Sequence, residues 1–286
     1  MSIEDYLSQS LMQSSLESYL YDINKYKKNN KNADKYDYQK VMQYIEILRN
    51  ENSVSNVKRV IASIKKYYDY LIEIRKRKDN PARAIRIRDG KENPIQVQDL
   101  FTEKELQILL VPRIERYPFL AKRNKIIMSL LVHQGLRIGE IENIKLNDLN
   151  LEKATIQIHK TGITNARNLP LKAEQILLIY EFINQDRNKL KTWRNDQNAL
   201  LLGKLGTPIR KEDVDYLVST YQKQSKKKLT TTTIRQSVIA NLLIKNNDLR
   251  IVQHFAGHKS PDTTEKYRQT GLNALRTAID KLHPIK

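Results

Sequence analysis

The 286-residue chain contains 51 Lys and Arg against 32 Asp and Glu, a formal net charge of +19, which favours a polyanionic partner such as nucleic acid, although lysine-rich surfaces also serve solubility. It has no cysteine, so disulfide scaffolds, thiolate zinc sites and thiol nucleophiles are excluded. No apolar run reaches the roughly 18–20 residues of a membrane helix and no signal peptide opens the chain, so we expect a cytoplasmic protein without a membrane partner.

The N-terminal part of the chain is predicted to be helical. Apolar residues recur every three or four positions over 56–77, which places them on one face of a helix, and two shorter runs of the same kind precede it. Asn80-Pro81 ends the pattern, because proline disfavours helix at the residue before it. We therefore predict a small helical domain over residues 1–80 and an interdomain linker over 81–100.

The remainder, 101–286, is predicted to be a second, larger domain of helices with a small antiparallel sheet. Residues 123–133 form an apolar helix, 154–158 alternate as a strand, and 167–171 is placed to pair with that strand. Leu200–Leu202 is the candidate for a third short strand. The fold class is thus mainly α, with an α+β second domain. Further helices are expected at 211–221, 234–245 and 248–256 and along the stripe of Leu272, Leu275, Ile279 and Leu282.

Four pieces of the second domain carry residues suited to phosphate chemistry. Arg137 follows a glycine at the end of an apolar helix, where a guanidinium is held rigidly and partly buried. Lys160 lies at the tip of the predicted hairpin. Arg235 heads a helix, a Gly-His pair follows with His258, and Tyr267 comes after two threonines. Two forked guanidinium groups suit a phosphate better than two ammonium groups do, because they bond its oxygens in pairs.

The order of these five residues resembles that of the tyrosine site-specific recombinases. The best matching stretches are GLRIGEIENIKLNDL and DLRIVQHFAGHKSPDTTEKYRQT, and the likeness covers almost the whole chain. The resemblance implies a SAM-like helical core-binding domain at 1–80 and a catalytic domain at 101–286. It also implies recombination by a homotetramer on double-stranded DNA with paired inverted-repeat core sites, and a monomer free in solution.

The resemblance implies a role for each residue. Tyr267 would attack a phosphodiester and form a 3′-phosphotyrosyl link, while Arg137 and Arg235 would hold the non-bridging oxygens and favour the phenolate. Lys160 would protonate the leaving 5′-oxygen, and His258 would hydrogen-bond the phosphate or assist proton transfer. No cofactor is expected. No metal is expected either, because the arginines supply the positive charge that a metal otherwise provides.

One position departs from the family pattern. The family usually has a histidine three residues before its second arginine, and Thr232 stands there in this chain. A hydroxyl can donate to a phosphate oxygen but cannot shuttle a proton near neutral pH, so we expect Thr232 in a working but slow or tightly regulated site. Glu140 would orient the site, unless it only forms a surface pair with Arg137 on one helix face. Two alternatives stay open: a catalytically silent DNA-binding relative and a topoisomerase IB-like enzyme.

Other expectations concern DNA contacts, assembly and biological role. The terminal stripe over 271–286 would pack on its own domain or, as the resemblance implies, dock into a neighbouring protomer. No extra DNA-binding domain is seen before the first helices, which favours a Xer-like enzyme or a transposon resolvase, acting in integration, excision or resolution of a mobile element or replicon dimer. His254 and His258 are spaced like metal ligands, but no third ligand lies nearby. The candidate phosphate contacts are Lys58, Lys65, Lys66, Arg83, Arg86 and Arg88.

Overall fold

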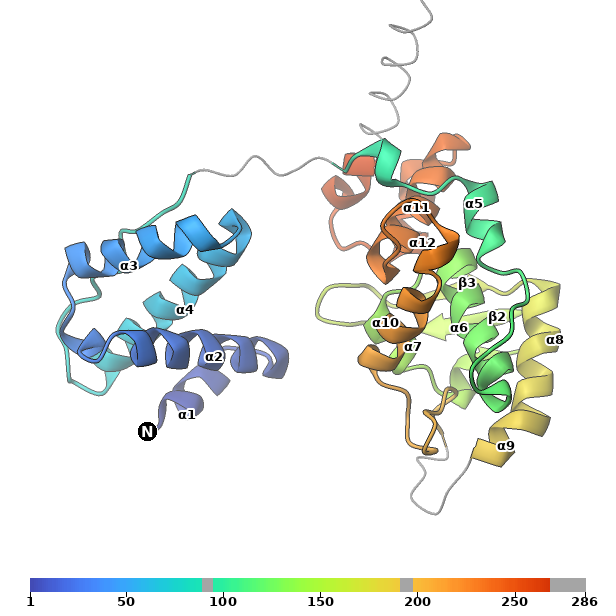
Figure 1. Cartoon of the computed structure of the whole chain (residues 1–286), viewed down its shortest axis with the longest axis horizontal. Helices are drawn as coiled ribbons and strands as arrows, with labels where there is room; N and C mark the ends of the chain where they lie inside the picture. Colours follow the sequence, from blue (N-terminus) through green and yellow to red (C-terminus); the bar gives the residue numbers. More distant parts are fainter. Residues whose placement is uncertain (89–94, 191–197, 268–286) are drawn as a thin grey trace, which may run out of the picture. The chain divides into compact units, whose positions relative to one another are not determined.

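The computed structural model describes residues 1–88, 95–190 and 198–267. The chain divides into two compact units, Met1–Asn93 and Pro94–Lys286, and each has its own hydrophobic core (Figure 1). Ala82 and Ile85 are buried in the core of the first unit, so the predicted start of the linker at residue 81 is too early. Their apolar side chains are stabilised by leaving water, which keeps the segment packed. Within the described ranges, no helix is both long enough and apolar enough to cross a membrane.

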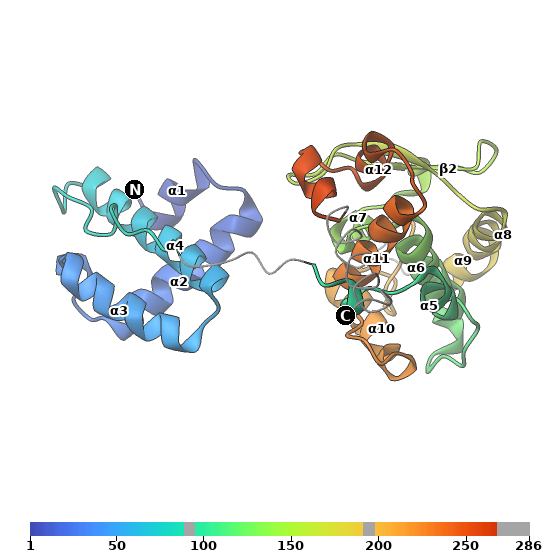
Figure 2. The same cartoon turned by 90° about the horizontal axis from the view of Figure 1, so that it is seen from above.

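The first unit is a helical bundle, and its third and fourth helices begin at polar caps. Asp37 and Ser53 each accept a hydrogen bond from a backbone N–H of the first helical turn that follows. Tyr26 and Tyr68 meet in the core with their hydroxyls 2.8 Å apart, so both phenols are satisfied away from water. The crossing of the second and fourth helices is visible in Figure 2. The helices are α1 (Ile3–Ser8), α2 (Gln13–Asn29), α3 (Tyr38–Glu51) and α4 (Val54–Glu73).

The second unit is built around one central helix, α6 (Ala121–Gln134), which is buried almost all round, as its apolar sequence predicts. Helix α11 (Thr231–Ile244) packs on it, and residues 261–267 form a further helical turn before the described part ends. The other helices are α5 (Glu103–Ile108), α7 (Ile138–Glu142), α8 (Ala173–Glu181), α9 (Arg187–Leu190), α10 (Lys211–Thr220) and α12 (Leu249–Ala256).

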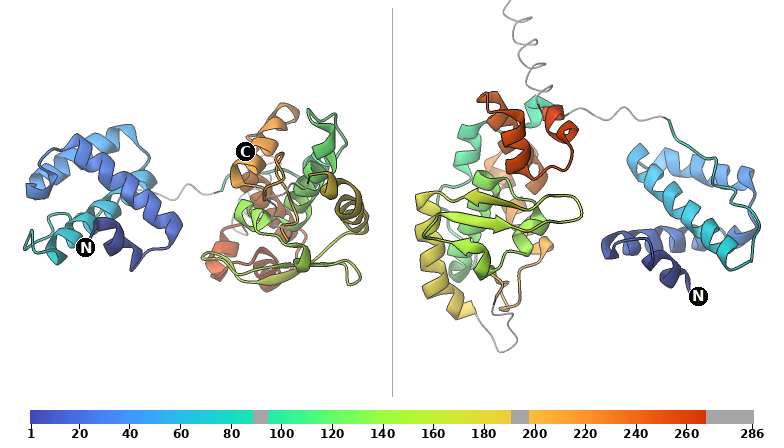
Figure 3. Two further views of the ribbon diagram at one scale, coloured as in Figure 1. Left: turned by 90° about the horizontal axis from the view of Figure 1, so that it is seen from below. Right: turned by 180° about the vertical axis from the view of Figure 1, so that it is seen from behind.

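A three-stranded antiparallel sheet lies at one side of this unit, beside α8 and α9 (Figure 3). Its strands are β1 (Leu149–Asn150), β2 (Thr155–Ile158) and β3 (Arg167–Pro170), in the order β1-β2-β3, with Ile156 opposite Leu169. The predicted hairpin is confirmed. The third strand is β1, so its prediction at Leu200–Leu202 is wrong. All three leucines there are buried, and such a run without alternation does not fit a strand with one exposed face.

Candidate active site

Two left-handed glycines place the first site residues. Gly135 ends α6 with φ +58°, and Gly257 ends α12 with φ +67°, a conformation that a residue without a Cβ adopts at little cost. The chain turns sharply at both points. Arg137 and His258 therefore follow immediately beyond the ends of two helices that come from distant parts of the sequence.

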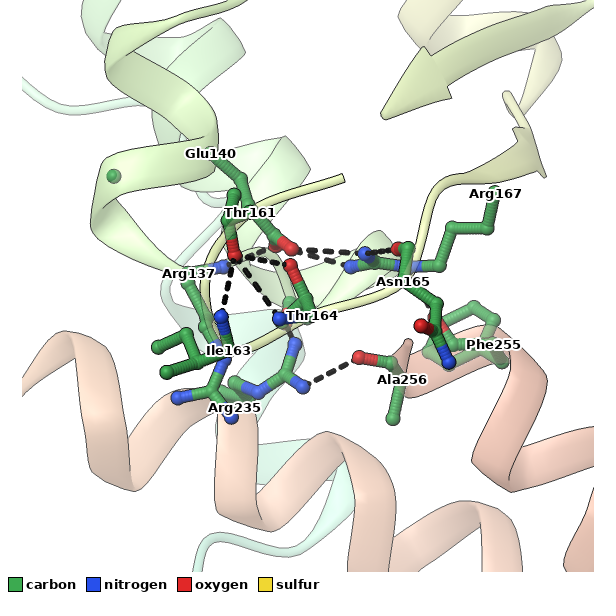
Figure 4. A network of polar contacts seen from close by, with 12 residues as sticks. Arg137, Glu140, Thr161, Ile163, Thr164, Asn165, Arg167, Arg235, Phe255 and Ala256 are labelled. Atoms are coloured by element: carbon green, nitrogen blue, oxygen red, sulfur yellow. Dashed lines mark hydrogen bonds and ion pairs between the residues drawn. The ribbon is translucent and has the colours of Figure 1, made fainter. Parts of the chain in front are cut away.

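Arg235 joins these two helix ends. It rises from the buried side of α11 and is only 5% exposed. Its Nη1 donates to the carbonyl of Gly135 and its Nη2 to the carbonyl of Ala256, both at 2.6 Å (Figure 4). Burial, and then the neighbouring Arg137, lower the pKa of Arg235 to about 10. The guanidinium is therefore still charged at neutral pH.

Arg137 is positioned by its backbone and keeps part of its side chain unused. It is the N-cap of α7, and its backbone N–H donates to Glu140 at 2.8 Å. Its Nε is buried and has no hydrogen-bond partner in the described part of the chain. A buried donor without an acceptor is costly, so this N–H is suited to a ligand that accepts a hydrogen bond from it. Its position beside Arg235 suits an anion.

His258 and Tyr267 lie against each other, with nearly parallel rings whose centroids are 6.2 Å apart. The Nδ1 of His258 is 2.9 Å from the hydroxyl of Thr264. Burial, and then Arg235 and Arg137, lower the pKa of His258 to about 4, so this imidazole is neutral at neutral pH. Because Nδ1 faces Thr264, the tautomer that carries its proton on Nε2 can donate a hydrogen bond to a phosphate oxygen.

The arginines favour the phenolate of Tyr267, as expected, but burial opposes them. Tyr267 is 9% exposed, and this burial raises the pKa of its hydroxyl. Arg235 and Arg137 do lower it, as expected, but they do not outweigh the loss of hydration. In this structure the phenol is therefore neutral at neutral pH and must lose its proton during the attack.

Lys160 sits on the hairpin between β2 and β3, which is bonded to the His258 segment. The backbone N–H of Asn165 donates to the carbonyl of Gly257 at 2.9 Å, and Lys259 donates to the carbonyl of Gly162 at 2.7 Å. Figure 2 shows the hairpin beside α12. Lys160 itself is exposed and makes no hydrogen bond or ion pair within the described ranges. Its ammonium is free to move, as a proton donor on a hairpin must be.

Thr232 lies in the first turn of α11, one turn before Arg235, and is exposed. The threonine run around it has a local function. Thr230 is the N-cap of the helix and accepts a hydrogen bond from the backbone of Thr233, so these neighbours stabilise the helix start. Thr232 takes no part in that cap, and its hydroxyl is available on the same helix face as Arg235.

Arg167, which no sequence motif singled out, forms a fully buried ion pair with Glu140. Nη1 and Nη2 of Arg167 donate to the two carboxylate oxygens of Glu140 at 2.8 and 3.0 Å (Figure 4). Burial alone would raise the pKa of Glu140, but Arg167 holds it below its usual range. The alternative of a surface pair with Arg137 is therefore wrong. The available signal was the strand phase, because Arg167 shares the inward face of β3 with Leu169.

The candidate DNA contacts all lie in the first unit and differ in exposure. Lys58, Arg86 and Arg88 are exposed. Lys66 is half-buried and donates to Ser10, and Lys65 is also half-buried. Arg83 is exposed but forms an ion pair with Asp69 at 3.2 Å. The strongest candidates are therefore the first three, since their charges have no protein partner in the described part of the chain.

Comparison with known families gives one match that covers more than half of the chain. The model of the phage integrase family matches residues 99–272. The tyrosine recombinase XerD of Oceanobacillus iheyensis is 26% identical over 296 residues, which cover 99% of this chain and 98% of that protein. XerC of Chlamydia pneumoniae is 28% identical over 249 residues, covering 85% of this chain and 77% of that protein.

Solved structures show the same fold at lower identity. The XerH site-specific recombinase bound to palindromic difH, in a post-cleavage complex, superposes with a TM-score of 0.73 at 20% identity, over 92% of this chain and 78% of that one. The Tn1549 transposon integrase in complex with transposon right end DNA gives 0.65 at 17% identity, over 99% of both chains. Mostly helical units with a small antiparallel sheet are thus shared by these proteins and this chain.

Proposed function

The chain belongs to the phage integrase family and, as a tyrosine recombinase, breaks and rejoins DNA at specific sites; from this premise we propose that Tyr267 is its nucleophile. The observation that carries the assignment is the buried, unpartnered Nε of Arg137 in the same site as Arg235, His258 and Tyr267. A phosphate at this point gives that N–H an acceptor. It also lies within reach of two guanidinium groups and one phenol.

The proposed chemistry proceeds in two balanced steps. In cleavage, the oxygen of Tyr267 bonds to the scissile phosphorus and its proton passes to solvent. The bond from phosphorus to the 5′-oxygen breaks, and that oxygen takes a proton from Lys160 to become a hydroxyl. In rejoining, the 5′-hydroxyl of a partner strand gives its proton back to Lys160 and its oxygen bonds to the phosphorus of the 3′-phosphotyrosine. The bond from phosphorus to the Tyr267 oxygen breaks, and that oxygen takes a proton from solvent. The phosphodiester bond energy is retained in the intermediate, so no ATP is consumed.

The remaining residues stabilise the charge that develops in these steps. Arg137 and Arg235 bond the non-bridging oxygens, where negative charge increases in the transition state. Neutral His258 donates one hydrogen bond to the same group. Thr232, on the α11 face that carries Arg235, adds a hydroxyl donor where the family usually has an imidazole. Its substitution by histidine should therefore leave cleavage measurable, and a large loss would show that the hydroxyl is fitted to this site.

Covalent trapping of DNA tests the proposed nucleophile. Nicked duplexes made from the DNA that flanks the gene lose a short strand on cleavage, so that rejoining stops and the protein–DNA adduct accumulates. We expect a slow band on a denaturing gel for the wild type, a DNA-linked peptide that contains Tyr267, and no band for Tyr267→Phe. Tyr180→Phe, at an exposed tyrosine on α8, is the matched control and should still give the adduct.

Other results would lead to the alternatives. An adduct that persists in Tyr267→Phe would mean that another residue is the nucleophile. Tight specific binding without any adduct would favour a catalytically silent binder. Relaxation of supercoiled DNA that needs no second cognate site would favour a topoisomerase IB-like enzyme.

We also propose that four copies act together on two paired sites and that the free chain is a monomer. The support is the heptad-like stripe of the segment 271–286, which lies outside the described residues, and the full-length similarity to XerD. Removal of 271–286 should abolish assembly on DNA in sedimentation experiments and leave a folded monomer; assembly by the shortened chain would refute the idea. We propose a cytoplasmic role in integration, excision or resolution of a mobile element or replicon dimer.

A further inference from the structure

Two arginines connect the same two segments of the active site. Arg235 bridges the carbonyls of Gly135 and Ala256. Arg167 forms a second bridge beside the first: it holds Glu140 on one side and donates from Nε to the carbonyl of Phe255 at 2.7 Å on the other (Figure 4). The segment 135–140 thus meets the segment 255–256 through two guanidinium groups. These segments carry or directly precede both Arg137 and His258.

We propose that Arg167 is a positioning residue that keeps Arg137 and His258 in register by tying Glu140 to the end of α12. The inference rests on the proposed roles of Arg137 and His258. Glu140 transmits the effect, because its carboxylate also accepts the backbone N–H of Arg137. A shift of Arg167 therefore moves the start of α7, and with it the guanidinium that holds the phosphate.

The pair of Arg167 and Glu140 depends on the orientation of the guanidinium as well as on its charge. Both carboxylate oxygens are engaged by separate nitrogens, and the side chains of Arg167 and Glu140 are 0% and 1% exposed. A planar guanidinium fixes the angle between its partners, whereas the single ammonium of a lysine does not. Burial of two charges is a poor way to gain stability compared with apolar packing, so the pair is better explained by the positions that it fixes.

Gly257 shows how closely this bridge is fitted. A Cβ placed on Gly257 would lie 2.6 Å from Nη1 of Arg167, closer than Cβ atoms come to other heavy atoms in real structures. A glycine is therefore required at position 257 partly because the Arg167 side chain lies against its backbone. The position of His258 is thus coupled to the bridge that Arg167 forms.

Two variants of the pair test the inference with the full chain. Arg167→Lys keeps the charge without the fork, and Arg167→Met combined with Glu140→Gln removes both charges while the amide oxygen still accepts from Arg137. The probe is the nicked duplex that traps the wild type. We expect unchanged DNA affinity in gel shifts and single-turnover cleavage that is slower by about 100-fold, since small displacements of a catalytic group have effects of that size.

A substrate with a methylphosphonate at the scissile position separates positioning from stability. This group is uncharged and depends much less on a guanidinium at its non-bridging oxygen. If Arg167 acts through Arg137, the defect of its variants should shrink to less than about 10-fold on the methylphosphonate, as should the defect of Arg137→Ala. Arg123→Met is the matched control. Arg123 is another buried arginine, bonded to the carbonyl of Leu202 instead of the site, and its loss should not change the ratio of the two rates.

The outcomes distinguish an error in the proposed active site from an error in the role of Arg167. If Arg137→Ala shows no recovery on the methylphosphonate, or if the wild type forms no adduct, the proposed site is at fault. If Arg137→Ala recovers while the Arg167 variants are equally slow on both substrates, Arg167 only stabilises the fold and the inference is wrong. Normal cleavage by the folded double variant would also refute it.

Discussion

The guanidinium groups of the three arginines differ in their hydrogen-bond partners. Arg235 is held by two carbonyls and Arg167 by a carboxylate, while Arg137 keeps one buried donor unused. Three guanidinium groups against the one carboxylate of Glu140 leave two positive charges. That excess complements a pentacoordinate phosphorane with two negative charges better than the singly charged phosphodiester, so the site favours the transition state over the substrate.

The free ammonium of Lys160 should be needed only when the leaving group is poor. We predict that Lys160→Ala slows cleavage of ordinary DNA by about 100-fold or more, the usual size of a lost general acid. A duplex with sulfur in place of the 5′-bridging oxygen should restore most of the rate, because a thiolate leaves without a proton. Single-turnover cleavage of both duplexes measures this. Lys153→Ala, at an exposed lysine before β2, is the control, and an equal defect of Lys160→Ala on both duplexes would contradict the assignment.

The buried imidazole of His258 should make folding sensitive to acid. Its pKa is lowered to about 4 in the folded chain, against about 6.5 when unfolded, chiefly by burial and then by Arg235 and Arg137. Between these values the unfolded chain binds a proton that the folded chain does not. Stability is thus fully present above pH 6.5 and decreases as the pH falls towards 4, by on the order of 3 kcal/mol.

Urea unfolding between pH 4 and pH 7.5 measures this effect. His258→Gln should flatten the pH dependence, although some of it remains because burial also lowers the pKa of His133. His254→Gln, at an exposed position on the same segment, should leave the dependence unchanged. An identical slope for wild type and His258→Gln would show that this imidazole is not the acid-sensitive group.

At the scale of elements, the sequence predicts the helices and strands that have a local hydrophobic pattern. The hairpin of β2 and β3 follows from alternation, and α6 and α11 follow from apolar periodicity and capping. The pair of Arg167 and Glu140 was missed because its two members lie 27 residues apart, and no local pattern joins them. The two-residue strand β1 was missed because it is too short to show any period. The order of the motifs predicts that Arg137, Arg235, His258 and Tyr267 share one site. The sequence does not show how deeply Tyr267 is buried, so it could not predict that burial outweighs the arginines in setting the pKa of the phenol.

The two helix-ending glycines allow a matched test of the bridge. Gly135→Ala should destabilise the fold by about 1–2 kcal/mol, the cost of a left-handed residue with a Cβ. Gly257→Ala has the same cost and also pushes its Cβ into Arg167, whereas the contact at Gly135 is a Val238 methyl at 3.2 Å. We therefore predict a larger loss for Gly257→Ala in urea unfolding, together with a larger loss of cleavage. Equal losses would mean that Arg167 moves aside freely.

At the scale of the whole molecule, we propose that the first unit holds the DNA by charge and the second carries out the chemistry. The site residues lie in the second unit, and the exposed basic residues Lys58, Arg86 and Arg88 lie in the first. Phosphate contacts fix register without reading bases, so these cations suit a general hold on the duplex. The excess of 51 basic over 32 acidic residues supplies the attraction, and its strength must depend on salt.

This salt dependence tests two of the three exposed contacts without knowledge of the target sequence. A plot of log affinity against log salt for a random duplex has a slope set by the number of neutralised phosphates, and each lost contact lowers the slope by about 0.9. We predict that change for Arg86→Ala and for Lys58→Ala. Lys31→Ala, in the turn after α2, removes the same charge away from these residues and should leave the slope unchanged. If both Arg86→Ala and Lys58→Ala keep the wild-type slope, neither residue contacts a phosphate, because the loss of such a contact returns a counterion to the DNA.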